Sequence, residues 1–119
     1  VDESQAAALL AGIEHALAHD RIFTRPDLTL AQLATTLNAT PHQISQVLNR
    51  FGGASFHDIV NRRRVEEVKA RLLDPDSRRL TLEGIGAAAG FGSRSAMYAA
   101  FQRFEGKTPA AFRSQHAQP

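Results

Sequence analysis

Four uncharged polar side chains recur at helical spacing within residues 41–51, PHQISQVLNRF. They are His42, Ser45, Gln46 and Asn49. Residues spaced i, i+3, i+4 and i+7 share one face of a helix, so the apolar Ile44, Leu48 and Phe51 are expected on the opposite, inward face. Gln and Asn pair well with adenine, His can reach guanine, and Ser accepts several partners. This face therefore carries the chemistry needed to recognise base edges in a DNA major groove.

A second face of this kind follows 53 residues later in the chain. Its members are Ser95, Tyr98, Ala99 and Gln102, and Arg94 precedes them near the helix start. A small residue such as Ala99 permits close approach in a groove about 12 Å wide, and Arg94 can bind one guanine through two hydrogen bonds. The alternative is an ordinary solvated helix face. Such faces are usually richer in Lys and Glu, and this one has neither, so the groove interpretation is favoured.

Two arginines occupy equivalent positions one residue past these faces, Arg50 and Arg103. We assign them to DNA phosphates, which attract basic side chains but carry no sequence information. Helix N-termini can add backbone N–H donors to phosphates. Thr40 and Ser93 begin the helices that carry the two faces, and Thr29 and Thr81 begin the shorter helices before them.

The elements that position these residues are all predicted to be helices, because no segment alternates with period two over the length of a strand. Residues 4–19 form an amphipathic helix with Ser4 as a candidate N-cap. The remaining helices are expected to begin after Thr29, Thr40, Ser55, Thr81, Ser93 and Thr108. Asn38 and Gly90 are expected in the left-handed conformation that lets a helix end in a tight turn.

Two long segments are versions of one pattern, LTLAQLATTLNATPHQISQVLNRF and LTLEGIGAAAGFGSRSAMYAAFQRF. An offset of 52 aligns Asn38 with Gly90, and an offset of 53 aligns Leu48 with Phe101. The offset changes from 52 to 53 within the turn, where a one-residue insertion is tolerated. Each copy is a helix-turn-helix unit. Two units in tandem indicate DNA binding much more strongly than one, the alternative being a helical bundle with a duplicated hairpin.

The segment IGAAAGFGSRSAMYAAFQRFEGKTPAAFR resembles the second helix-turn-helix of the AraC/XylS family of bacterial transcription regulators. The matching residues are Gly90, Phe91, Ser93, Ser95, Phe101, Gly106, Thr108, Pro109, Phe112 and Arg113. FHDIVNRRRVEEVKARLL resembles the family's linker helix, and the whole resemblance covers residues 28–113. Alanine is usual in the family at Gly86, and phenylalanine at Met97 and Leu48. These departures are expected to loosen the cores and to leave the proposed binding faces untouched.

The resemblance implies the C-terminal DNA-binding domain of a regulator whose effector domain lies on another part of a longer chain. It implies double-stranded DNA as the partner, base contacts from the two faces, RNA polymerase as a further candidate partner, and no cofactor. The expected architecture is all-α, with two helix-turn-helix subdomains at 29–62 and 63–113 that share a long linker helix. The N-terminal helix and lead-in occupy 1–28, and 114–119 form a tail.

The linker helix, 56–73, has two apolar faces that lie nearly opposite one another. One contains Phe56, Ile59 and Val60, and the other contains Val65, Val68 and Leu72. Its two halves are therefore expected to pack on different subdomains. Its length of roughly 27 Å is of the same order as the roughly 34 Å of one DNA turn. Arg62, Arg63 and Arg64 lie where the faces exchange; we expect a structural role for Arg64 and a phosphate contact for one of the others.

Charge and composition narrow the choice of function. Residues 1–28 carry a net charge of −3 and residues 29–119 a net charge of +5, which weakly favours a polyanionic partner. Without cysteine the chain has no disulfide or thiolate metal site, and it fits a reducing compartment such as the cytoplasm. No apolar run reaches the roughly 20 residues of a membrane helix. No catalytic motif is present, so an enzyme is not expected.

Several features leave alternatives open. His15 and His19 have zinc-ligand spacing, but no third ligand is evident nearby, so a solvated face is favoured over a metal site. The first residue is Val1, and we expect the chain to be part of a longer protein. The N-terminal helix could pack on the first subdomain, link to another domain or mediate dimerisation. The rival to DNA binding is a helical module that docks a partner protein.

Overall fold

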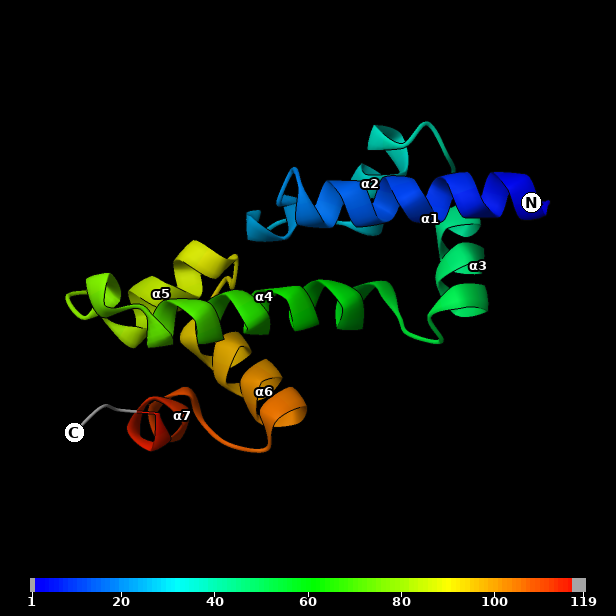
Figure 1. Ribbon diagram of the computed structural model, residues 1–119. Coiled ribbons are helices and arrows are strands. Elements are labelled where there is room, and N and C mark those ends of the chain that lie inside the picture. The colour runs from blue at the N-terminus through cyan, green and yellow to red at the C-terminus, as the bar shows by residue number, and fades with distance from the viewer. Residues whose placement is uncertain (1, 117–119) are drawn as a thin grey trace. The chain divides into compact units, whose positions relative to one another are not determined.

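The computed structural model describes residues 2–116, and within them it contains seven α-helices and no strand, as predicted (Figure 1). The helices are α1 (Glu3–Ala18), α2 (Leu30–Thr36), α3 (Pro41–Phe51), α4 (Phe56–Leu73), α5 (Leu82–Ala89), α6 (Arg94–Glu105) and α7 (Pro109–Gln115). Two short 3₁₀ helices, η1 (Ile22–Thr24) and η2 (Pro75–Ser77), follow α1 and α4. The all-α class expected from the sequence is therefore confirmed.

Hydroxyl N-caps begin the helices of both helix-turn-helix copies, as the sequence predicts. Thr29, Thr40, Thr81 and Ser93 each accept a hydrogen bond from the backbone N–H three residues on. The predicted cap of α1 is wrong, because Asp2 and not Ser4 begins that helix. The Asp2 carboxylate accepts from the Gln5 N–H at 2.7 Å, and the Gln5 side chain accepts from the Asp2 N–H at 3.2 Å. This reciprocal pair is a capping box, which satisfies two N–H groups at the start of the helix.

The two turns have the backbone conformation expected of them. Asn38 has φ 58° and Gly90 has φ 108°, both in the left-handed region. Space is tight at Gly90, where an added Cβ would lie 2.1 Å from the carbonyl oxygen of Phe23. Glycine is therefore required at position 90 for two reasons, its φ angle and the close approach of another segment.

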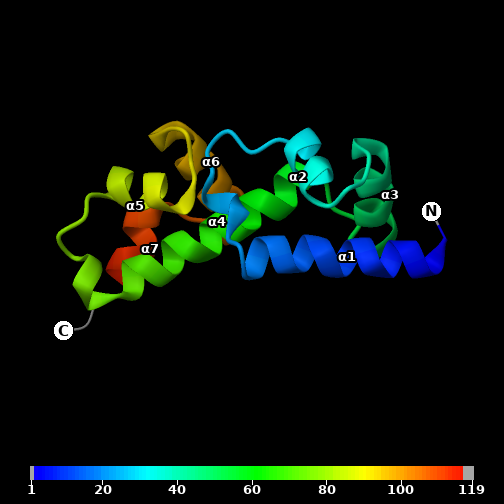
Figure 2. The ribbon, with the colours of Figure 1, turned by 90° about the horizontal axis from the view of Figure 1, so that it is seen from above.

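The chain divides into two compact units. The first consists of Val1–Ile22 and Asp27–Val60, and the second of Phe23–Pro26 and Asn61–Pro119. In the first unit α3 packs against both α1 and α2, and Figures 1 and 2 show α3 meeting α1 near its N-terminal end. Ile13 and Leu17 from α1, Leu33 from α2 and Ile44 from α3 are fully buried. Of the roles considered for the N-terminal helix, the structure shows packing in the first subdomain.

One residue predicted to face inward in the first unit does not. The Phe51 side chain is 47% exposed, because the buried residues of α3 end at Leu48 and the last turn of the helix extends beyond them. Its ring lies beside the Arg50 guanidinium, 5.4 Å from ring centroid to Cζ. The exposed face of α3 is therefore longer than the sequence pattern indicates.

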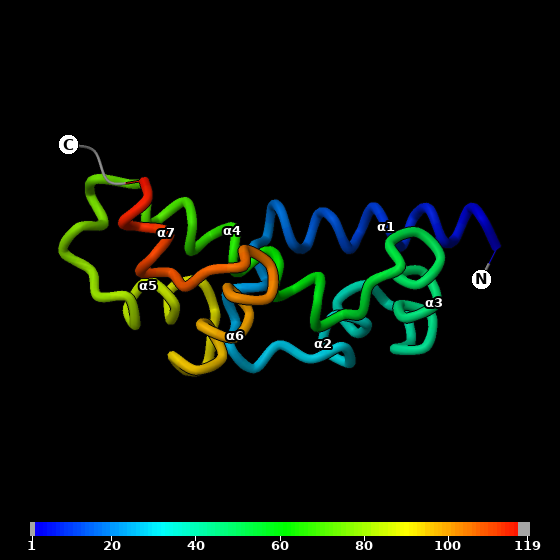
Figure 3. The backbone as a smooth tube through the Cα atoms, turned by 90° about the horizontal axis from the view of Figure 1, so that it is seen from below, coloured from blue at the N-terminus to red at the C-terminus, as the bar shows by residue number. Residues whose placement is uncertain are grey.

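In the second unit, α5, α6 and α7 gather around the later part of α4 (Figure 3). Val65 and Val68 of α4 join Ile85, Phe101 and Phe112 in one buried cluster. The Phe101 and Phe112 rings meet edge to face, with centroids 5.6 Å apart. This packing fixes α6 by its inner side and leaves its outer side available for contact.

The departures from the family pattern in this unit compensate one another. A Cβ at Gly86 would lie 2.5 Å from the sulfur of Met97, so the missing methyl group makes room for the methionine. Met97 is fully buried. The glycine thus leaves the space that the flexible thioether occupies, and the expected loosening of the core stays a prediction.

Candidate nucleic-acid interface

The first polar face lies on the outer side of α3. His42, Gln46 and Asn49 are exposed and Ser45 is half-buried, while the inner side of the same helix is buried. Thr40 caps the helix, and its hydroxyl oxygen accepts from the Gln43 N–H at 3.1 Å. The capping bond uses the oxygen of the Thr40 hydroxyl and not its hydrogen, so this O–H can donate a hydrogen bond beside the exposed side chains of α3.

The N-terminal helix borders this face, which sequence reasoning did not predict. Gln46, Asn49 and Arg50 line an open groove together with Ala6 of α1. The Arg50 guanidinium pairs with the Glu3 carboxylate at 3.2 Å, and both side chains are largely exposed. An exposed ion pair of this kind is weak and screened by salt, so Arg50 can exchange its carboxylate partner for another anion.

The second face lies on the outer side of α6. Ser95, Ala99 and Gln102 are exposed, and Tyr98 is half-buried against the apolar cluster of the second unit. Ser93 caps the helix by accepting from the Ala96 N–H at 3.1 Å. Arg103 is exposed and lies over the Phe104 ring, with its Cζ 5.2 Å from the centroid. The structure thus places Ser95, Tyr98, Ala99 and Gln102 together on the outer side of α6, with Arg94 and Arg103 near its two ends.

A small polar network, which the sequence analysis did not predict, holds Arg94. The Arg94 guanidinium donates to the Tyr98 hydroxyl at 3.2 Å and to the Glu83 carboxylate of α5 at 3.3 Å. It also lies over the Tyr98 ring, 5.0 Å from the centroid. The Tyr98 hydrogen bond, followed by the one to Glu83, raises the pKa of Arg94. Glu83 corresponds to Ala31 at the repeat offset of 52, so the repeat gave no signal for it.

Comparison with protein families identifies what these two units are. The family model for a helix-turn-helix domain matches residues 33–115, which includes both polar faces and the linker helix. The chain belongs to the AraC-type helix-turn-helix family. Members of this family are DNA-binding domains of transcription regulators. No curated protein sequence matches the chain.

Solved structures share the AraC-type fold at low sequence identity. The C-terminal domain of AraT, a response regulator from Geobacillus stearothermophilus, has a TM-score of 0.79 and 24% identity, with 94% of this chain and 88% of that chain covered. An AraC-type transcriptional regulator from Chromobacterium violaceum has a TM-score of 0.75 and 18% identity, with 99% of both chains covered. The DNA-binding domain of AdpA, a global transcriptional factor solved in complex with a target DNA, has a TM-score of 0.74 and 21% identity, with 92% of both chains covered.

The helix α1 lies outside the matched AraC-type region, since the family model begins at residue 33. The similarity to the Chromobacterium violaceum structure nevertheless covers 99% of this chain, α1 included. The N-terminal helix is therefore part of the shared fold, in agreement with its packing against α3.

The arginines of the AraC-type linker helix lie in different environments. Arg64 donates from its Nε to the Phe23 carbonyl and from a terminal nitrogen to the Arg25 carbonyl, each at 2.7 Å. These two bonds confirm the structural role expected for Arg64. Burial lowers the pKa of its guanidinium. Arg62 is exposed, with its Cζ 5.3 Å from the Phe104 ring centroid.

A lysine of the same helix, α4, binds the C-terminal end of α6. Lys69 on α4 pairs with Glu105 at the end of α6 at 3.2 Å and with Glu66 at 3.3 Å. Burial opposes the charged form, but the hydrogen bonds to Glu105 and Glu66 outweigh it and raise the pKa of Lys69. This bridge orients α6 from its C-terminal end.

The expectation that no third ligand lies near His15 and His19 is wrong. Asp20 lies beside both imidazoles. Sequence periodicity missed Asp20 because α1 ends at Ala18 and the chain turns there.

No helix within residues 2–116 combines the length and apolar character needed to cross a bilayer.

Proposed function

We propose that this chain binds a specific site in double-stranded DNA, with α3 and α6 as recognition helices in adjacent major grooves. The observation that carries the proposal is the exposed outer side of both helices. Each follows a short helix and a left-handed turn, each begins at a hydroxyl N-cap, and each presents polar side chains almost free of charge above a buried core. A helix of this kind fits a major groove, where base edges offer donors, acceptors and the thymine methyl group.

The roles proposed for individual residues follow from chemistry and exposure. Base contacts are proposed for His42, Ser45, Gln46 and Asn49 of α3 and for Arg94, Ser95, Tyr98, Ala99 and Gln102 of α6. Phosphate contacts are proposed for Arg50, Arg103, Thr40 and Ser93. Arg50 already binds a carboxylate, so its environment accepts an anion. Glu83 and Tyr98 bind the Arg94 guanidinium at the start of α6, which supports the proposed guanine contact.

The wider assignment follows from the family. As an AraC-type domain, the chain would serve a bacterial transcription regulator whose effector domain lies elsewhere on a longer protein, and RNA polymerase is a further proposed partner. The proposal implies a cytoplasmic protein. Since the family and fold are those of DNA-binding regulators, no catalytic role is proposed.

The decisive experiment is selection of bound sequences from random duplex DNA, followed by affinity measurements at several salt concentrations. We expect sequence-specific binding, with a logarithm of the association constant that falls linearly as the logarithm of the salt concentration rises. A chain that enriches no sequence and binds no duplex, at low or high salt, would refute the proposal and favour the rival module that docks a partner protein.

A further inference from the structure

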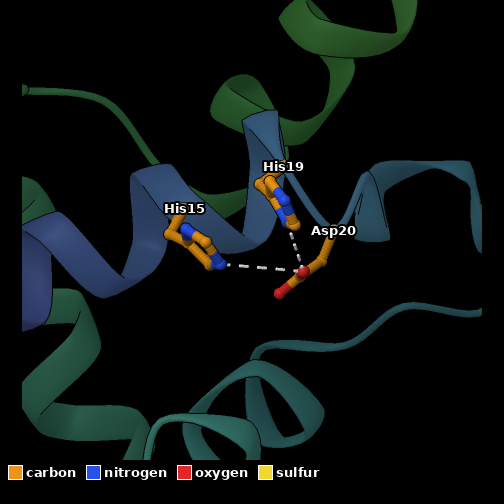
Figure 4. Close-up of side chains that lie close together, drawn as sticks. All are labelled: His15, His19 and Asp20. Carbon is orange, nitrogen blue, oxygen red and sulfur yellow. Dashed lines mark hydrogen bonds and ion pairs between the residues drawn. The ribbon is translucent and has the colours of Figure 1, made fainter.

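Three side chains that can ligate a metal converge at the C-terminal end of α1 (Figure 4). The Asp20 carboxylate oxygen lies 3.1 Å from Nδ1 of His19 and 3.8 Å from Nε2 of His15. The two imidazole rings stack with centroids 4.6 Å apart and planes inclined by 15°. One candidate ligand atom from each residue lies within 4.8 Å of the others.

The backbone brings Asp20 into this group. His19 is the C-cap of α1, and the N–H groups of both His19 and Asp20 donate to the His15 carbonyl, at 2.8 and 3.1 Å. Arg21 then takes a left-handed conformation, φ 53°, which carries the chain away. The Asp20 backbone is therefore tied to the same helical turn that presents the histidines, so little backbone freedom would be lost when the three side chains share one ion.

The chemistry of these ligands is that of a borderline transition metal. Imidazole suits Zn²⁺, Ni²⁺ and Cu²⁺, and an aspartate oxygen completes a three-ligand set. Zinc binds imidazole nitrogen and carboxylate oxygen at about 2.0–2.2 Å, which places tetrahedral ligand atoms on the order of 3.3–3.6 Å apart. The Asp20 oxygen lies near this separation from both nitrogens, at 3.1 and 3.8 Å, and the stacked imidazoles would rotate so that their in-plane lone pairs meet at one ion.

We propose that His15, His19 and Asp20 form a site for a divalent transition metal such as Zn²⁺, with water in the remaining position. The three side chains are 62%, 75% and 48% exposed, so an ion can reach them without opening the fold. A bound ion would pin the end of α1 where the chain leaves the helix. This proposal does not rest on DNA binding, and each could fail without the other.

The test is a calorimetric titration of the tag-free chain with zinc chloride, repeated on His15→Ala, His19→Ala and Asp20→Asn. One Zn²⁺ per chain is expected, with affinity reduced at least about tenfold in each histidine variant, since loss of even an outer-shell group costs 10- to 100-fold. His57→Ala removes an exposed histidine from α4 and is the matched control, for which unchanged affinity is expected.

A second readout uses the unmodified chain. Zinc should move the imidazole NMR signals of His15 and His19 and leave that of His57 in place, and it should raise the melting temperature by linkage. No zinc binding, affinity equal to wild type in both histidine variants, or shifts confined to other histidines would overturn the proposal. Asp20→Asn preserves side-chain size at the turn, so its affinity remains informative even if a histidine variant unfolds.

Discussion

Arg64 in the middle of α4 donates a hydrogen bond to the Phe23 carbonyl at 2.7 Å, although 41 residues separate the two in sequence. A second bond from the same guanidinium, to the Arg25 carbonyl at 2.7 Å, completes a clamp on the segment that follows α1. The Phe91 ring centroid lies 5.9 Å from the Arg64 Cζ. These bonds join Phe23–Pro26 to α4 within the second unit.

Removing this clamp should destabilise the second unit. Arg64→Lys keeps the charge but has no planar fork to bind two carbonyls, so we expect a loss of about 1.5–3 kcal/mol in unfolding free energy, and a larger loss for Arg64→Ala. Urea unfolding, monitored by circular dichroism, measures the unfolding free energy of each variant. Arg79→Ala, an exposed arginine outside the clamp, is the control and should change stability by less than about 0.5 kcal/mol. Equal stability of Arg64→Lys and wild type would show that the clamp is dispensable.

Gly90 should tolerate no side chain. Gly90→Val combines a β-branched residue at φ 108° with a Cβ position 2.1 Å from the Phe23 oxygen, and a loss of a few kcal/mol is expected. Gly90→Ala should also be strongly destabilising. Gly92→Ala is the matched control, since its Cβ would meet no atom within 4 Å. The two alanine variants are compared by melting temperature, and similar melting temperatures would contradict the prediction.

The turn at Gly90 shows which parts of this fold local sequence can predict. Caps, left-handed turns and the inward faces of helices depend on residues a few positions apart, so Thr40, Asn38 and Ile44 could be placed from the sequence. Contacts between elements depend on tertiary packing. The pairing of Arg50 with Glu3 and of Arg94 with Glu83 joins residues 47 and 11 positions apart, with no periodic signal. Asp20 and Phe51 were misjudged at helix ends, where the helical period stops applying.

Arg50→Ala and Arg103→Ala should weaken binding to all DNA sequences alike. Each variant removes one proposed phosphate contact. The negative slope of log affinity against log salt concentration should therefore become shallower by about one. Fluorescence anisotropy on a selected site and on a scrambled site measures both quantities. A change in sequence preference with an unaltered salt slope would assign the arginine to a base instead.

Glu3 is expected to compete with DNA for Arg50. Glu3→Gln frees the guanidinium from its carboxylate and should strengthen binding by about two- to fivefold at low salt without altering sequence preference. Glu14→Gln is the control, because it removes the same charge from the same helix about 16 Å along its axis. If both variants strengthen binding equally, the effect is one of net charge and not of the Glu3–Arg50 pair.

The DNA site itself should be asymmetric, because the two recognition faces differ. The α3 face has no arginine, whereas the α6 face begins with Arg94 held by Glu83 and Tyr98. The linker is one continuous helix of 18 residues, about 27 Å long, so we expect two specified blocks centred roughly 10 bp apart. Arg94→Ala should cost about 1–3 kcal/mol and relax specificity in one block only.

Footprinting of one bound monomer on selected DNA, with wild type and Arg94→Ala, tests this arrangement. Gln102→Ala is a useful companion variant, because it lies on the same face of α6 and has no place in the Arg94 network. It should relax specificity in the same block, at a position different from that read by Arg94. We expect two protected blocks. Both variants should relax specificity in the same block and leave the other block unchanged. A palindrome bound only by dimers, or a single short protected block, would mean that one of the two helices does not read bases.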